Sequence, residues 1–283
     1  MLDIILDTLL DTLKLLPFLF VAFLIIEIIE HKLSDKNRDI IKKSGKYGPV
    51  LGGIIGIIPQ CGFSTMATNL YVTRIVSLGT LVSIYLSCSD EMLPILLSEN
   101  APIKVIVEIL TIKACIGIIS GIVIDLVLRK KKHNNVNFDY DICNHEHCHC
   151  EEENIFRSSL SHTFKIAIFI LIINFILNCM FYYGGEELLS SLLLKGNILS
   201  SFLTGLIGLI PNCGASVMIT ELYLNNVISL GATLSGLLAG SGVAILILFR
   251  TNKDLKDSIR VLFLVYGIGV VSGIIIDLIS TLS

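Results

Sequence analysis

The sequence predicts an all-α polytopic membrane protein made of two inverted-topology repeats, with broken or re-entrant helices at paired Pro-x-Cys-Gly motifs. Three observations predict this fold. The 283 residues are 53% hydrophobic and only 16% charged, with a mean hydropathy of +0.81. One phrase occurs twice, as GIIGIIPQCGFSTM at 53–66 and as GLIGLIPNCGASVM at 205–218. Basic residues change sides between the two halves, as they do in inverted repeats.

Several apolar stretches are long enough to cross a bilayer, which takes about 20 residues. They occupy residues 9–29, 103–128, 164–183, 226–249 and 259–281. Residues 1–12 contain Asp3, Asp7 and Asp11 and no Lys or Arg, unlike the basic start of a signal peptide. We therefore expect the first stretch to remain in the protein as a helix.

Each copy of the repeated phrase interrupts an apolar run. Pro59 and Pro211 lack a backbone donor, and Gly62 and Gly214 permit backbone angles that other residues resist. At membrane depth, unwound backbone is tolerated only inside protein or beside a wet cavity. We interpret residues 48–73 and 200–225 as re-entrant hairpins, although both arms of each hairpin could also cross separately.

The following span in each half also contains a break, near residues 87–90 in the first half and 239–242 in the second. Counted as hydrophobic segments, each half then holds five, and the chain holds ten. An odd number per half is what an inverted arrangement requires.

The two halves align without a gap at an offset of 152 positions. The match joins Tyr71 to Tyr223 and Ser83 to Ser235. It continues to the glycines and aspartate of the last helix in each half: Gly117, Gly121 and Asp125 meet Gly269, Gly273 and Asp277. This is an internal repeat of about half the protein. We interpret Asp125 and Asp277 as solvated boundary residues or caps.

Loop charge predicts the orientation, because short cytoplasmic loops are enriched in Lys and Arg. Residues 31–46 hold six basic residues, whereas the equivalent loop at 183–198 holds one. Residues 98–104 hold one, whereas 250–260 hold four. We therefore expect external termini and three parts: a first membrane repeat at 1–132, a cytoplasmic linker at 133–160 and a second membrane repeat at 161–283.

If the two hairpin tips enter from opposite sides, their polar residues meet near the midplane. The half-helices would add free carbonyls and positive N-terminal ends. The candidate metal ligands are the tip residues and the polar residues at which the halves differ, namely Gln60, Cys61, Ser64, Asn69, Cys88, Asp90, Glu91, Asn212, Cys213, Ser216 and Glu221. The alternatives are that Cys61 and Cys213 only pack as small apolar residues, and that Asp90 and Glu91 form an external turn.

Two other features involve charged or ligating residues. Glu108 and Lys113 share one span, and we expect them to form a buried structural ion pair. The linker reads CNHEHCHCEEE at 143–153 and lacks zinc-finger spacing. We expect loose metal capture there, with a solvated acidic loop as the alternative. The capture residues would be Cys143, His145, His147, Cys148, His149 and Cys150.

With its PQCG and PNCG phrases, ten apolar segments and a His/Cys linker, the chain resembles the ten-helix heavy-metal exporters of bacteria. That family is described as manganese transporters and, by analogy, as arsenic efflux proteins. The resemblance implies a multi-pass protein of the bacterial cytoplasmic membrane that exports a metal or metalloid ion.

The predicted function is export of a divalent transition metal, with manganese first, by alternating access. No nucleotide-binding loop occurs in the sequence, so the expected energy source is an ion gradient, with protons first. Arsenite efflux through Cys61, Cys88 and Cys213 is the nearest alternative, because thiolates suit softer ions than carboxylates do. An intramembrane thiol redox enzyme and a metal-sensing membrane protein are alternatives of other classes. We expect no enzymatic activity, no tightly bound cofactor and no nucleic-acid partner, and the oligomeric state is open.

Overall fold

The computed structural model describes residues 47–58, 61–89, 92–131 and 198–282, together with single positions between 13 and 24 and between 160 and 175. Residues 133–159 of the linker lie outside these residues, as do most positions of the predicted stretches at 9–29 and 164–183. Every regular element in the described part is a helix. The first half contains α3 (Gly48–Gly56), α4 (Cys61–Val72), α5 (Leu78–Ser87), α6 (Met92–Ser98) and α7 (Ile103–Lys131). The second half contains α11 (Ile198–Gly208), α12 (Cys213–Leu224), α13 (Leu230–Ala239), α14 (Ala244–Thr251) and α15 (Leu255–Leu282).

Within the described part, four helical segments are long and apolar enough to cross a membrane. They are α5 with α6, α7, α13 with α14, and α15. The first and third are mostly buried inside the protein, whereas α7 and α15 expose most of their surface. Large apolar side chains such as Ile119 and Val123 on α7 and Phe263 and Ile275 on α15 account for much of that exposure. This distribution fits a polytopic membrane protein whose outer helices face lipid.

The helices end and restart at four positions along the chain. One interruption lies between α3 and α4 and another between α11 and α12, at the Pro-Gln-Cys-Gly and Pro-Asn-Cys-Gly phrases. The other two divide α5 from α6 and α13 from α14. The sequence predicted an interruption at each of these places.

The two halves make the same contacts 152 residues apart. Asp125 accepts hydrogen bonds from Ser77 Oγ (2.6 Å) and from the backbone N–H of Gly79 (2.9 Å). Asp277 accepts from Ser229 Oγ (2.7 Å) and from the N–H of Gly231 (2.9 Å). Each aspartate therefore caps the N-terminus of a neighbouring helix, α5 or α13, which is the cap role that the sequence allowed.

Glycines make the crossing of α5 and α7 unusually close. A Cβ added to Gly79 would lie 2.2 Å from the carbonyl oxygen of Gly121, and one added to Gly121 would lie 2.5 Å from that of Gly79. Gly231 and Gly273 repeat this contact between α13 and α15. Small residues that let two backbones approach are typical of helix pairs in membranes. Each half thus contains one tightly packed helix pair of the same design.

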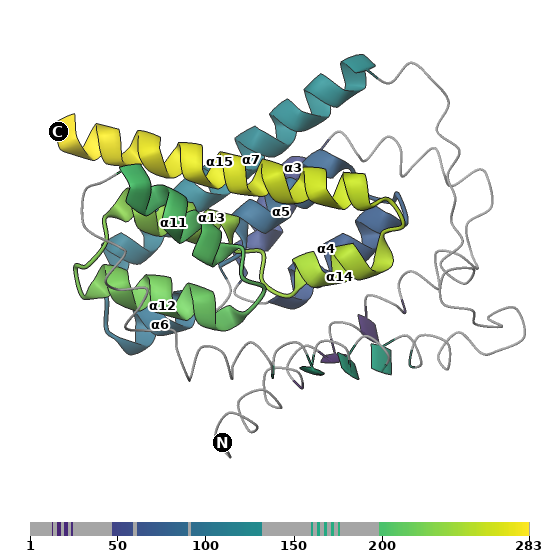
Figure 1. Ribbon diagram of the computed structural model, residues 1–283, viewed down its shortest axis with the longest axis horizontal. Helices are drawn as coiled ribbons and strands as arrows, with labels where there is room; N and C mark the ends of the chain where they lie inside the picture. Colours follow the sequence, from purple (N-terminus) through teal and green to yellow (C-terminus); the bar gives the residue numbers. More distant parts are fainter. Residues whose placement is uncertain are drawn as a thin grey trace, which may run out of the picture.

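The hairpin helices pack across the boundary between the halves. α4 contacts α14, and its repeat equivalent α12 contacts α6, the repeat equivalent of α14. The contacts are therefore reciprocal, as a two-fold relation between the halves requires. Figure 1 shows α4 beside α14 and α12 beside α6, with the long helices α7 and α15 running in opposite senses.

Candidate metal site at the helix interruptions

Within each half, the two helix interruptions lie close to each other. In the first half, Ser89 Oγ, from the break after α5, donates a hydrogen bond to the carbonyl of Ile57 at the end of α3 (2.5 Å). In the second half, a Cβ added to Gly240 would lie 3.6 Å from the carbonyl oxygen of Gly208 at the end of α11. Each break of a central span therefore lies next to the end of the preceding short helix.

Several predicted ligands are buried close to these breaks. Cys88 is buried and is the C-cap of α5, where the backbone leaves the helix. Ser64 and Asn69 are buried on α4. Asn212 is also buried, and its side-chain oxygen accepts from the N–H of Gly214 (3.1 Å) as the N-cap of α12. The amide of the second phrase thus has a structural role that explains why a helix restarts there.

The other described candidates are less enclosed. Ser216 is half-buried, and its carbonyl accepts from Thr220 Oγ1 (2.7 Å). Glu221 is exposed near the C-terminal end of α12. It is eight residues from the N-terminus of that helix, which corresponds to about 12 Å along the axis. The structure therefore separates the Glu221 carboxylate from the break that precedes α12.

The remaining candidates lie outside what the structure describes. These are Gln60, Asp90, Glu91, the side chains of Cys61 and Cys213, and the linker residues Cys143, His145, His147, Cys148, His149 and Cys150. Within the described ranges, no group of three or more His, Cys, Asp or Glu residues could hold a metal ion. The predicted proximity of Cys61 and Cys213 stays a prediction.

Sequence reasoning named Ser64 and Asn69 but missed that they belong to a stripe of buried polar residues on α4. Ser64, Thr65, Thr68 and Asn69 follow the spacing of one helical face, and all are buried. Thr65 Oγ1 and Asn69 Nδ2 have no hydrogen-bond partner among the described residues. Polar groups at membrane depth are costly to bury unsatisfied. The stripe therefore provides unsatisfied polar groups along a helix that begins at the first Pro-x-Cys-Gly phrase.

This stripe lies against the other half of the protein. Thr68 Oγ1 is 2.5 Å from the hydroxyl of Tyr85, and that hydroxyl donates to the carbonyl of Ala244 at the start of α14 (3.3 Å). Tyr85 is fully buried. Its signal in the sequence was a single aromatic residue within the span 75–97.

Lys113 is the second feature whose role the sequence did not reveal. It lies on α7, is 1% exposed, and donates to the carbonyl of Cys88 and to that of Leu237 (2.9 Å). Glu108 is exposed, so the predicted buried Glu108–Lys113 pair is wrong. Five residues of helix rotate the chain by about 500°, which leaves the two side chains about 140° apart around α7.

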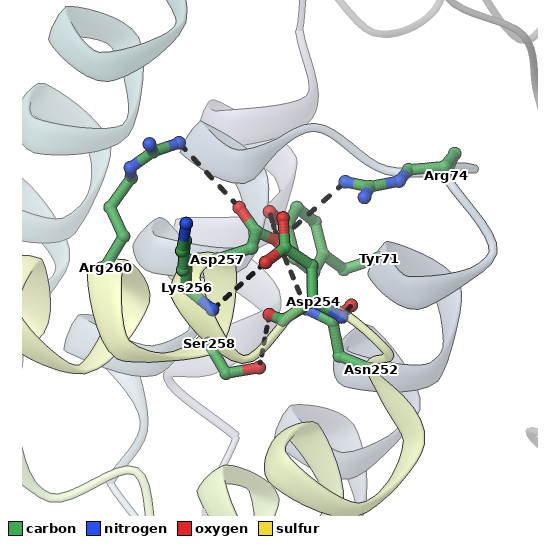
Figure 2. A network of polar contacts seen from close by, with 8 residues as sticks. All are labelled: Tyr71, Arg74, Asn252, Asp254, Lys256, Asp257, Ser258 and Arg260. Carbon is green, nitrogen blue, oxygen red and sulfur yellow. Dashed lines mark hydrogen bonds and ion pairs between the residues drawn. The ribbon is translucent and has the colours of Figure 1, made fainter.

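A polar network joins the halves at one end of the bundle, as Figure 2 shows. Asp257, in the first turn of α15, accepts from the Tyr71 hydroxyl (2.7 Å) and from Asn252 Nδ2 (3.1 Å). Arg74 and Arg260 lie 3.9 Å and 4.0 Å from its carboxylate oxygens. We call these five residues the Asp257 network. They tie the turn after α4 to the connection between α14 and α15.

The same connection carries its own local caps. The N–H of Asp254 donates to Asn252 Oδ1 (3.2 Å), and the N–H of Lys256 donates to Asp254 Oδ1 (3.0 Å). Ser258 Oγ donates to the carbonyl of Asp254 (3.4 Å), as Figure 2 also shows. These bonds hold the start of α15 in place, so that Asp257 points toward Tyr71.

The comparisons with known proteins agree with this architecture. No curated protein and no solved structure matches the chain. A model of one protein family, described as "Putative, 10TM heavy-metal exporter", matches residues 1–183 and 151–282, which together include nearly the whole chain. The apolar helices of the structure fit a family of polytopic membrane proteins. The chain therefore belongs to the family described as "Putative, 10TM heavy-metal exporter".

Proposed function

We propose that this protein exports a divalent transition metal, with manganese as the first candidate, by alternating access between two inverted repeats. The observation that carries the proposal is the reciprocal packing of α4 on α14 and α12 on α6 around the four helix interruptions. Interrupted helices that meet at the interface of two related halves are where transporters of this kind bind their substrates. Family membership supplies the substrate class.

The Asp257 network supports an antiparallel relation of the halves. Within each half, the turn after the hairpin helix and the loop after the next span lie at opposite ends of that span. Tyr71 and Asp257 belong to these two places, one from each half. Opposite ends of equivalent elements therefore meet, which favours inverted over parallel repeats. The arrangement also fits the predicted cytoplasmic location of residues 250–260.

Helix length supports re-entrant hairpins. α3 has 9 residues, α11 has 11, and α4 and α12 have 12 each. At 1.5 Å per residue these helices are about 14–18 Å long, against about 30 Å of hydrocarbon. Each arm thus reaches about half of the membrane, which suits tips that meet near the midplane.

We further propose that the metal is bound by groups at these tips and breaks. Carbonyl and amide oxygens of both Pro-x-Cys-Gly phrases, together with Asp90 and Glu91, form an oxygen-rich set that suits Mn²⁺. The thiols of Cys61, Cys88 and Cys213 extend the set toward softer ions. The buried hydroxyl groups of α4 extend the row of polar groups from the hairpin tip toward Arg74.

The experiment is a growth screen of a bacterial strain that lacks this protein against Mn, Zn, Cd, Ni and arsenite, with intracellular metal measured by mass spectrometry. We expect manganese to accumulate several-fold in the deletion strain and to return to normal when the wild-type chain is supplied. Asp90→Asn and Glu91→Gln should impair export more than Cys61→Ser or Cys213→Ser, because carboxylates bind Mn²⁺ better than thiols do.

A chain that lacks residues 143–153 serves as the matched control. We expect it to export normally at saturating metal and poorly at low metal, because the linker ligands lie outside the apolar segments. Unchanged content of all five elements in the deletion strain would contradict the proposal. Loss of arsenite resistance in the Cys variants alone would replace manganese by trivalent arsenic.

A further inference from the structure

Lys113 places one buried positive charge where the two halves meet. Its ammonium donates to the carbonyl of Cys88 and to the carbonyl of Leu237 (2.9 Å). Cys88 is the C-cap of α5, and Leu237 lies in the last turn of α13. The two acceptors therefore come from equivalent helices of the two halves, at the ends where each central span is broken.

Carbonyls at a helix C-terminus carry partial negative charge and lack an intrahelical donor. At broken membrane helices they are groups that bind a transported cation. In this protein a cation already binds both ends, and it belongs to a side chain. The carbonyls of Cys88 and Leu237 therefore form a cation site that Lys113 occupies.

The charge has no equivalent in the second half. The repeat alignment places Val265 of α15 opposite Lys113, and Val265 is fully buried. The ends of two equivalent helices are thus both hydrogen-bonded to one ammonium group, which comes from the first half. A requirement of packing alone would be met by an apolar residue, as it is at Val265, so the charge points to a role in ion handling.

We propose that the Lys113 ammonium is a tethered cation that competes with the exported metal for the carbonyls of Cys88 and Leu237. The inference rests on the proposed function and extends it to a residue that determines affinity. Two cations within a few Å repel each other strongly away from bulk water. The metal therefore gains these carbonyls only when the ammonium withdraws, and the return of the ammonium expels the metal. Weak binding of this kind lets an ion leave as readily as it enters.

The test is equilibrium binding of Mn²⁺ to the purified full chain by calorimetry at one ionic strength. Lys113→Met removes the charge and keeps a long unbranched side chain, and Lys113→Arg keeps the charge. Val265→Met makes the matched change at the equivalent buried position. We expect Lys113→Met to bind Mn²⁺ at least about tenfold more tightly than wild type, because the repulsion is removed. Lys113→Arg and Val265→Met should remain within about twofold of wild type.

Equal affinity of wild type and folded Lys113→Met would overturn the inference. If Lys113→Met does not fold, a structure of the wild-type protein with Mn²⁺ decides the question. Withdrawal of Lys113 Nζ from both carbonyls is the expected result, and retention of both bonds beside a bound metal would overturn the inference. If the wild-type protein exports metal but shows either of these two overturning results, the proposed function still stands. A wild type that neither binds nor exports any of the screened ions overturns both.

Discussion

The turns at the two ends of the bundle have the same backbone conformation but carry different side chains. After α4 the chain turns at Arg74, and after α12 it turns at Asn226, with φ angles of 62° and 58°. At both ends, the backbone N–H groups two and three residues before the next helix donate hydrogen bonds to the same carbonyl of the hairpin helix. At one end Tyr71 meets Asp257; at the other, the repeat alignment places Tyr223 and Val105 at these positions.

This difference shows which features of the two halves are equivalent and which are not. The turns and helix caps, which fix the fold of each half, are the same. Among the residues that the structure describes, the tyrosine–carboxylate hydrogen bond between the halves is formed at the Asp257 end, whereas Val105 occupies the equivalent position at the other end. A protein with two related conformations can favour one of them through such a bond, since a few kcal/mol decide the populations. Under the proposed alternating-access mechanism, the Asp257 network would stabilise the conformation described here, in which these contacts are formed.

Among the changes that test this comparison, removing the Asp257 carboxylate should have the largest effect on stability. Asp257→Ala leaves the Tyr71 hydroxyl and the Asn252 amide without their buried acceptor, so we expect the free energy of unfolding to fall by about 2–3 kcal/mol. Val105→Ala at the equivalent position should cost about 1 kcal/mol or less. Denaturant unfolding of both variants in the same detergent measures the difference, and equal losses would remove the distinction between the ends.

A single hydroxyl tests the same comparison with a smaller change. Tyr71→Phe deletes the 2.7 Å hydrogen bond to Asp257, and we expect a loss of about 1–2 kcal/mol. Tyr223→Phe, at the half-buried equivalent position, should cost less than about 0.5 kcal/mol. Thermal melts of the two variants provide the measurement. A larger loss for Tyr223→Phe would mean that the Val105 end depends on its own hydroxyl contact.

The smallest effect is expected from the arginines. Arg74 is 42% exposed in its side chain and lies 3.9 Å from Asp257, so Arg74→Ala should cost less than about 1 kcal/mol. Arg260→Ala, with a side chain that is 62% exposed and 4.0 Å away, should cost no more. Both losses should shrink as salt rises, because exposed charges are screened. A large loss that salt does not change would show that the arginines, and not the hydrogen bonds, hold this end together.

Local pattern predicted much of the fold. Pro, Gly and apolar runs act within a few residues, so the interruptions near residues 57–60, 88–91, 209–212 and 240–243 were visible in the sequence. The repeat alignment also paired Asp125 with Asp277, which the sequence left as boundary residues or caps, and the structure gives both the same cap contacts. These features depend on residues that are close in the chain or duplicated in it.

The contacts between halves could not be read in the same way. Lys113 and Leu237 are 124 positions apart, and Tyr71 and Asp257 are 186 apart. Their meeting depends on the reciprocal packing, which leaves no local pattern. One signal was present in the alignment: Lys113 stands opposite Val265, and Asp257 stands opposite Val105. A charge with an apolar equivalent marks a position where the two halves have separate tasks.

The reciprocal packing of α4 on α14 also constrains how the protein is made. Thr68 on α4 bonds to the carbonyl of Ala244 (3.5 Å), a residue 176 positions later in the chain. At about 5–20 residues per second, a ribosome adds that many residues in about 9–35 s. During this interval the surface of α4 that packs against α14 has no partner, because α14 has not been synthesised. The packing of α4 can therefore be completed only after the second half has been synthesised. We expect the insertion machinery to shield α4 until translation ends.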